Sequence, residues 1–244
     1  MMKHLKTIIG VVALCAVFAC TKSQDAGSGY VDFKVKNNSE VADITKSNVS
    51  DYTTLPASGD FTIVIKDAGN AQVWSGKCSE WDPTTSLVEG EYTVEVSYGH
   101  LEVEGFNKPY FYGSQDFTVV GNETVAVEIP AVLGNTIIRI SCSDNFKNYY
   151  KDYTFKLTRD GSDVVTFTKD ETRAAFIDGY KIRVEGTLTS ETKTQTFAKD
   201  YTNLFEATAY TLAFDASQVG GSTITISFND TVQEVELGNI ELND

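Results

Sequence analysis

The chain has 244 residues and a formal net charge of −14, because 34 acidic residues outnumber 20 lysines and arginines. Binding to a phosphate backbone needs a basic patch, and this acidic chain shows none, so we expect no nucleic acid partner. The length exceeds what one β-sandwich of roughly 100 residues needs and is sufficient for two.

The first 20 residues have the layout of an export signal. Lys3 and Lys6 supply a positive start, residues 7–19 are almost entirely apolar, and the small Ala19 stands before Cys20. The apolar run is shorter than the roughly 20 residues that a membrane-spanning helix needs. We therefore predict that residues 1–19 are a signal peptide that is removed.

The end of this signal, Val17-Phe18-Ala19-Cys20, resembles the lipobox of bacterial lipoproteins, in which the cysteine is lipidated and becomes the new N-terminus. Two or three acyl chains on one cysteine hold a protein durably on a membrane. We therefore expect residues 20–29 to be the lipidated Cys20 and a polar tether. An ordinary secreted protein with an incidental cysteine is the alternative.

Beyond residue 29 the chain alternates between apolar and polar residues, which is typical of half-buried antiparallel strands. In the first such segment Val31, Phe33 and Val35 face one way, and the residues between them are charged. The pattern recurs at residues 61–65, 92–98, 125–129, 153–157, 180–184, 210–214 and 224–228. No window gives a convincing helix, so the sequence predicts an all-β protein.

The expected strands of the two halves match each other in order, which indicates an internal duplication. Residues 61–69 align without a gap on residues 153–161, an offset of 92. The further matches are 87–96 with 176–184, 117–119 with 210–212, and 125–129 with 224–228. A period of this length suits a whole sandwich. We predict two tandem antiparallel β-sandwich domains, immunoglobulin-like or transthyretin-like, at residues 30–132 and 133–244.

The link between these domains contains the apolar residues Ala131, Val132 and Leu133. Flexible linkers are usually rich in glycine and serine. We therefore expect the link to be packed at an interface between the domains.

Two cysteines remain available for a disulfide, because Cys15 leaves with the signal and Cys20 is lipidated. Export makes a bond between Cys78 and Cys142 chemically permissible. Cys142 also follows Ile138 and Ile140 on the apolar face of an expected strand, as a buried free thiol would. Both alternatives, a disulfide and two free thiols, stay open.

The residues form no recognisable catalytic or metal-binding motif. His100 is the single histidine of the mature chain, and no partner at zinc-ligand spacing accompanies it. The acidic turns 67–70 and 160–163 lack the full spacing of a calcium loop, so a turn-forming role is favoured. We expect a non-enzymatic protein without metal or cofactor. A glycosidase-like enzyme that uses paired carboxylates is the remaining enzymatic alternative.

Aromatic residues are the best candidates for binding a ligand. Trp81 and the run Tyr110, Phe111 and Tyr112 could form an exposed platform that stacks on a sugar ring or a partner protein. In a strand, Tyr110 and Tyr112 share one face and Phe111 takes the other. At least one of these rings is therefore expected near the surface.

Several of these features together resemble a family of uncharacterised Bacteroidetes cell-envelope lipoproteins: the lipobox, the tandem sandwiches, Tyr92 and Tyr180 after glycine turns, and residues 109–113 ahead of a strand. More distantly, the chain is similar to fimbrillin-type subunits, two-sandwich lipoprotein precursors that serve in adhesion. Those subunits are typically cut by an arginine-specific protease after a first strand. Here the first arginine is Arg139, inside the expected opening strand of the second domain.

The resemblance implies a lipid-anchored protein of the outer membrane, exposed at the cell surface and attached to the membrane through Cys20. Its expected role is adhesion or the surface presentation of a pilus or fimbria, with a protein or a glycan as partner. The alternative is a glycan-binding accessory lipoprotein of a polysaccharide-uptake system that uses the aromatic cluster.

Overall fold

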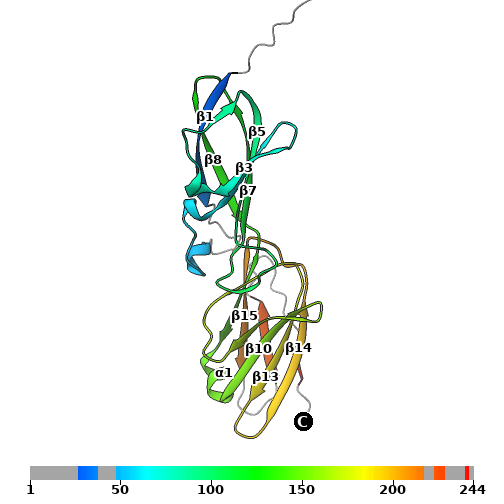
Figure 1. Cartoon of the computed structure of the whole chain (residues 1–244). Coiled ribbons are helices and arrows are strands. Elements are labelled where there is room, and N and C mark those ends of the chain that lie inside the picture. The colour runs from blue at the N-terminus through cyan, green and yellow to red at the C-terminus, as the bar shows by residue number, and fades with distance from the viewer. Residues whose placement is uncertain (1–26, 38–47, 217–222, 229–239, 242–244) are drawn as a thin grey trace, which may run out of the picture.

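The structure, a computed structural model, describes residues 27–37, 48–216, 223–228 and 240–241. The predicted signal peptide, the predicted lipidation site Cys20 and most of the predicted tether lie outside these residues. Figure 1 shows two halves arranged end to end, with strand β1 (Ser28–Asn37) starting at the pole that is remote from the second half.

The first half is one seven-stranded sheet, of order β3-β2-β5-β7-β8-β1-β4, that folds into two layers. Its other strands are β2 (Thr62–Asp67), β3 (Gln72–Lys77), β4 (Ser86–Val88), β5 (Gly90–Tyr98), β7 (Phe111–Val119) and β8 (Thr124–Leu133). This half also contains three short 3₁₀ helices, η1 (Val49–Asp51), η2 (Ser58–Asp60) and η3 (Cys78–Glu80). Strand β8 joins the layers, because it pairs with β1 along residues 124–131 and with β7 at residues 132–133.

The second half consists of a four-stranded sheet, β11-β10-β13-β14, and a six-stranded sheet, β17-β16-β15-β9-β12-β6. Strand β6 (Gly105–Phe106) comes from the first half of the sequence. The others are β9 (Thr136–Cys142), β10 (Asp152–Arg159), β11 (Ser162–Thr168), β12 (Ala175–Ile177), β13 (Ile182–Thr189), β14 (Thr194–Tyr201), β15 (Thr208–Ala216), β16 (Thr223–Phe228) and β17 (Ile240–Glu241).

The alternation in the sequence correctly marks the buried face of the strands. Val31, Phe33 and Val35 are buried while the charged residues between them are exposed, and β5 and β10 repeat the pattern. Burial of each such side chain stabilises the fold by about 1.5–3 kcal/mol. The apolar faces form two clusters, as expected for a pair of sandwiches. The first cluster lies mainly in the first half and continues across the junction into Ile137, Ala174 and Phe176 of the second half.

Neither sandwich is purely antiparallel, which corrects the predicted arrangement. Strand β1 runs parallel to β8, and β9 runs parallel to β15. Each pair joins the first strand of a half to a strand late in the same half, so a long connection separates the two members, as parallel pairing requires. Apolar periodicity reports the buried face of a strand and carries no information about the direction of its neighbour.

The same topology occurs in both halves and supports the predicted duplication. Strands β2, β3, β5 and β7 occupy the sheet positions that β10, β11, β13 and β14 occupy in the second half. The parallel pairs make β15 the counterpart of β8. The matches of residues 117–119 with 210–212 and of 125–129 with 224–228 are therefore wrong by one strand.

One short helix, α1 (Asp144–Tyr149), departs from the all-strand prediction. The Ser143 Oγ caps it by accepting a hydrogen bond from the Phe146 N–H, and Phe146 is buried in the second core. A serine N-cap satisfies one of the free amides at the start of a helix. A helix of six residues is too short to produce a detectable 3.6-residue period.

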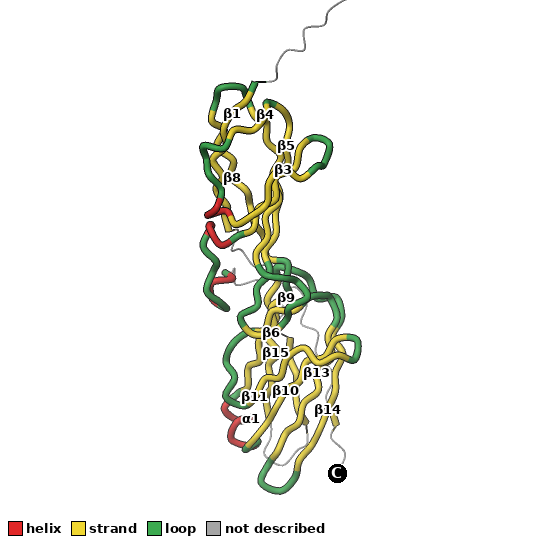
Figure 2. The backbone as a smooth tube through the Cα atoms, in the orientation of Figure 1, coloured by secondary structure: helices red, strands yellow, loops and turns green. Residues whose placement is uncertain are grey.

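The link between the halves is buried, as its apolar residues predict. Ala131 and Leu133 belong to the first core, and Asn135 is fully buried. The Asn135 Oδ1 accepts a hydrogen bond from the Tyr110 N–H, and its backbone oxygen accepts one from the Ala207 N–H at 2.8 Å. Figure 2 shows loops of both halves gathered where the two halves meet.

A second connection is the loop of residues 99–110, which we call the junction arm. Its strand β6 pairs with β12, so the first half contributes an edge strand to a sheet of the second half. The Phe106 ring contacts Phe167 edge to face at 5.0 Å, and the Arg173 guanidinium lies 4.6 Å from the centre of the Phe106 ring. The two sandwiches are thus connected by packing as well as by the chain.

Candidate functional site

Two of the predicted ligand-binding aromatics are core residues, so the prediction is wrong for them. Trp81 is only 8% exposed, and its Nε1–H donates to the Val31 carbonyl at 2.9 Å. Its ring packs edge to face on Phe33 and Trp74, at 5.3 and 5.2 Å. Phe111 is fully buried in the same core. Neither ring is available for a ligand.

The other two candidates form a stacked pair beside the junction. Tyr110 and Tyr112 project from the same face, as predicted, with ring centres 5.7 Å apart and planes within 13° of each other. Gly134 lies under them, where a β-carbon would come within 2.7 Å of the Tyr110 ring. Tyr112 is 37% exposed, and its hydroxyl lies 3.3 Å from the Glu206 carboxylate. The predicted platform is reduced to one exposed side chain, that of Tyr112.

Burial raises the pKa of the Tyr112 hydroxyl, and the neighbouring Glu206 carboxylate raises it further. The phenol therefore stays protonated at neutral pH and donates its hydrogen bond to Glu206. Glu206 belongs to the second half and Tyr112 to the first, so this contact adds to the junction. The Tyr112–Glu206 hydrogen bond therefore has a structural role and supplies no nucleophile or general base.

Cys78 and Cys142 are free thiols in the structure, which corrects the possible disulfide between them. Cys78 packs against the first core and Cys142 against the second. Burial raises the pKa of both thiols, that of Cys142 to about 11. A thiol with a raised pKa forms little thiolate and is a poor nucleophile. Neither cysteine is a candidate for covalent catalysis.

The acidic turns have structural roles. One Asp67 carboxylate oxygen accepts hydrogen bonds from the Gly69 and Ala71 amides, both at 2.9 Å. Asp160 and Gly161 both have positive φ, 48° and 83°, and form the two-residue turn between β10 and β11. His100 is exposed. In the described ranges, no group of three or more His, Cys, Asp or Glu residues could hold a metal ion.

The structure places a polar pocket on the second half that the sequence did not indicate. It lies on the outer face of the β10-β13-β14 sheet, where these strands approach the junction, and its volume is about 320 Å³. The residues that line it are Lys156, Thr158, Arg159, Asp160, Gly161, Asp163, Lys181, Ile182, Arg183, Glu185 and Asp200. Ile182 is the single aliphatic side chain among them.

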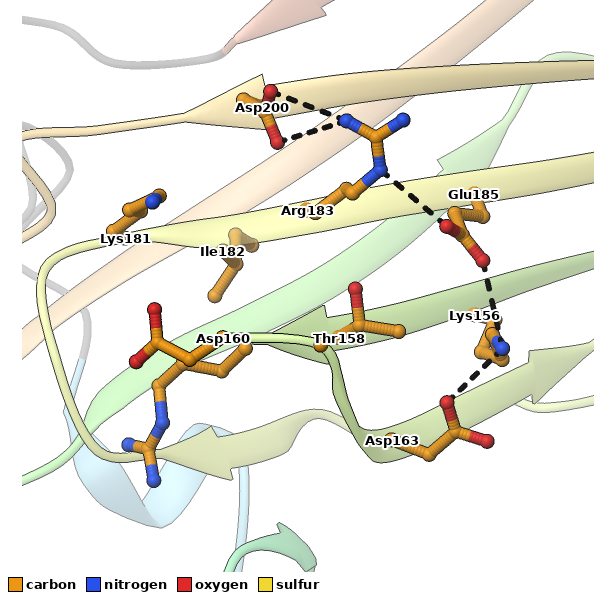
Figure 3. A pocket seen from close by; sticks show the side chains of 11 residues that line it. Lys156, Thr158, Asp160, Asp163, Lys181, Ile182, Arg183, Glu185 and Asp200 are labelled. Atoms are coloured by element: carbon orange, nitrogen blue, oxygen red, sulfur yellow. Dashed lines mark hydrogen bonds and ion pairs between the residues drawn. The ribbon is translucent and has the colours of Figure 1, made fainter.

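Ion pairs fix most of the charged side chains around this pocket (Figure 3). The Arg183 Nη1 lies 3.2 Å from both Asp200 oxygens, and its Nε lies 3.3 Å from Glu185. The Lys156 ammonium lies 3.0 Å from Asp163 and 3.5 Å from Glu185. Each pair is partly exposed and contributes little stability alone. Together they hold the side chains in one arrangement.

Arg159, which lines the pocket, also contacts the junction arm. The Arg159 Nη1 lies 3.1 Å from the Glu104 carboxylate of the arm and 3.2 Å from Asp178. Glu104 also accepts a hydrogen bond from the Asp178 N–H at 2.7 Å. Burial raises the pKa of Glu104, and the Asp178 amide and Arg159 oppose this shift. One wall of the pocket is therefore anchored to the first sandwich.

The described residues contain no helix that is long and apolar enough to cross a membrane. The structure is therefore that of an all-β protein of two joined sandwiches, with a polar pocket on the second sandwich and a partly exposed tyrosine pair at the junction.

The chain belongs to the family described as "Domain of unknown function (DUF4493)", whose sequence profile matches residues 27–244. No curated protein matches the chain. A fimbrial assembly protein from Parabacteroides distasonis has a similar structure, with a TM-score of 0.51 and 7% identity over 86% of this chain and 97% of that one. At this identity the likeness establishes the fold alone.

Two further structures resemble the chain more weakly. A candidate polysaccharide-binding protein from Bacteroides thetaiotaomicron has a TM-score of 0.47 and 10% identity, over 81% of this chain and 95% of that one. A candidate cell adhesion protein from Bacteroides ovatus has a TM-score of 0.46 and 11% identity, over 82% of this chain and 97% of that one.

Proposed function

We propose that this chain is a non-enzymatic cell-envelope lipoprotein that acts in adhesion or in the surface presentation of a fimbria. In this proposal Cys20 carries the lipid, residues 20–29 form the tether, and the two domains divide near residue 132. The anchor lies in the outer membrane and the sandwiches face outward. The partner at the surface is a protein or a glycan.

The observation that supports this role best is the end-to-end arrangement of the two sandwiches. Strand β1, which begins at Ser28, starts at the pole of the first sandwich that is remote from the second (Figure 1). A membrane anchor shortly before it would hold the second sandwich farthest from the bilayer. The buried link and the junction arm would keep that sandwich at a fixed distance, as presentation to a partner requires.

An accessory or anchoring role fits this chain better than a polymerising subunit that is cut by an arginine-specific protease. Arg139, the first arginine, lies in β9, which pairs with β15 on one side and β12 on the other. Cleavage there would divide a central strand of the second sandwich. The fold shared with a fimbrial assembly protein is compatible with an accessory role.

The test of this proposal is the fate of Cys20 in cells. Wild-type protein should incorporate radiolabelled palmitate and be removed from intact cells by external protease, whereas Cys20→Ala should do neither. Deletion of the gene should reduce attachment of cells to a host surface, and wild-type protein, unlike Cys20→Ala, should restore it. Palmitate incorporation without loss to external protease would contradict the outward orientation.

The glycosidase alternative has no observation in its favour. Asp163, Glu185 and Asp200 in the pocket are each engaged by a lysine or arginine. A glycosidase needs one carboxyl group that delivers a proton and a second that acts on the sugar. A glycan-binding accessory role is tested through Tyr112→Ala, since Trp81 and Phe111 are core residues.

A further inference from the structure

The pocket on the second sandwich is lined by Thr158, a residue that is almost entirely buried but whose hydroxyl remains accessible from the pocket. Thr158 is only 5% exposed, lines the pocket, and has no side-chain hydrogen bond within the described residues. Thr158 pairs with Arg183 across β10 and β13, so its side chain lies on the outer face beside the ion pairs (Figure 3). Because this hydroxyl forms no hydrogen bond to the described residues and is accessible only from the pocket side of a buried residue, a group that enters the pocket can complete its bonding.

Two charged side chains at the rim are also unengaged in the part of the chain that the structure describes. Lys181 lies at the start of β13 and Asp160 lies in the β10–β11 turn, and neither forms an ion pair there. The positive φ of Asp160 fixes the backbone that carries its carboxylate. The pocket therefore offers one free cation, one free carboxylate and one hydroxyl.

The balance of charge decides which ligand would fit. Four cations, Lys156, Arg159, Lys181 and Arg183, face four carboxylates, Asp160, Asp163, Glu185 and Asp200. A ligand with a net charge gains from one set and is opposed by the other. A neutral hydroxyl group both donates and accepts hydrogen bonds, so it can use both sets. Because ion pairs already hold most of these groups, binding would cost little ordering of side chains.

The size and polarity of the pocket narrow the class of ligand further. A volume of about 320 Å³ lies at the lower end of the range for small-molecule pockets, roughly 300–1,000 Å³. With Ile182 as its one aliphatic lining residue, the pocket offers little to a lipid or an aromatic ligand. A polyhydroxylated ligand of one or two rings fits both properties.

We propose that this pocket is a binding site for a neutral saccharide unit, with Thr158, Lys181 and Asp160 contacting its hydroxyl groups. The site is separate from the Tyr110–Tyr112 pair. The proposal rests on the glycan alternative of the function proposed above and names the site and the kind of saccharide, but binding itself needs neither the lipid anchor nor assembly into a fimbria. Its failure in solution would leave the lipoprotein proposal standing.

The test is ligand-detected NMR and calorimetry on the mature chain produced without lipid. The neutral sugar probes are mannose, galactose, N-acetylglucosamine, lactose and cellobiose, and the ionic probes are galacturonate, an anion, and alanine, a zwitterion. We expect at least one neutral probe to bind with a dissociation constant in the millimolar range. Thr158→Val should weaken that binding about tenfold, the effect of one lost hydrogen bond of about 1.4 kcal/mol. Lys181→Met should weaken it at least fivefold.

The matched control is Thr187→Val, an exposed threonine on the same face of β13 that does not line the pocket. It should leave binding unchanged. Thr158→Val should not lower the melting temperature, because the hydroxyl it removes has no structural partner. The proposal is overturned if no neutral probe binds, if only galacturonate or alanine binds, or if Thr158→Val binds as tightly as wild type.

Discussion

The junction arm makes a specific contribution to stability that one substitution removes. Phe106→Ala deletes the edge-to-face contact with Phe167 and the stacking with Arg173. The first contact contributes about 0.5–1.5 kcal/mol and the second about 0.5–1 kcal/mol. Loss of the half-buried ring surface adds about 1 kcal/mol. We expect Phe106→Ala to lower the free energy of unfolding of the second sandwich by about 2–3.5 kcal/mol.

Two optical probes can follow the halves separately in urea. Both tryptophans, Trp74 and Trp81, lie in the first half, so their fluorescence reports the first sandwich, whereas far-ultraviolet circular dichroism reports both. In wild type the two transitions should coincide, as expected for cooperative unfolding. In Phe106→Ala the dichroism should show an earlier phase, about 1–2 M lower in urea for a domain of this size.

Val103→Ala is the matched control, because Val103 lies in the same arm but is 42% exposed. It should leave the two transitions superimposed and the midpoint within about 0.2 M of wild type. The reasoning is refuted if Phe106→Ala behaves like this control, since the arm would then lie against the second sandwich without stabilising it.

Three further predictions concern the core, the thiols and acid stability. Trp81→Ala should cost about 3–5 kcal/mol of unfolding free energy in urea, because it leaves a core cavity; a loss below 1 kcal/mol would contradict burial. Cys78 and Cys142 should both be titrated by a thiol reagent after unfolding without reductant, and react slowly in the native protein; a missing thiol signal would indicate a disulfide. The hydrogen-bonded Arg173 lowers the pKa of the Glu171 carboxyl to about 2. The Glu171–Arg173 pair therefore stabilises the fold fully above the pKa of an unfolded glutamate, about 4.3, and this stabilisation is lost as the pH falls towards 2. Glu171→Gln should flatten the dependence of midpoint on pH in that window, and an unchanged slope would refute the assignment.

Most of the fold could be predicted from the sequence, because strand burial is a local property. The alternation in β1, β5 and β10 marks the residues that form the two cores. The packed link was also predictable, since Ala131 and Leu133 leave it too apolar for a solvated spacer. These predictions depend on nothing beyond the neighbours of each residue along the chain.

The relative direction of paired strands, and the correspondence of strands between the two halves, could not be predicted in the same way. Strands β7 and β15 both contain an aromatic residue, a threonine and an aliphatic residue in succession, at 117–119 and 210–212. Local similarity therefore aligned them, although β15 corresponds to β8. The parallel pairing that establishes this correspondence connects residues about 70 to 95 positions apart along the chain. Side-chain pattern within a strand does not specify that pairing.

The pocket on the second sandwich could not be predicted from the pattern within single strands either. Parity alone places Thr158 on the outer face of β10, where an isolated strand would expose its hydroxyl to water. The residue becomes buried because the β10–β13 register brings Arg183 opposite to it, and β14 then brings Asp200 opposite Arg183. Three separated segments thus create an environment that none of them encodes alone. Thr158 is thus buried as a residue, while its hydroxyl faces the pocket without a hydrogen bond to the described residues. A sequence pattern that alternates in and out along one strand cannot reveal such a position, because the strands that enclose it are far away in the sequence.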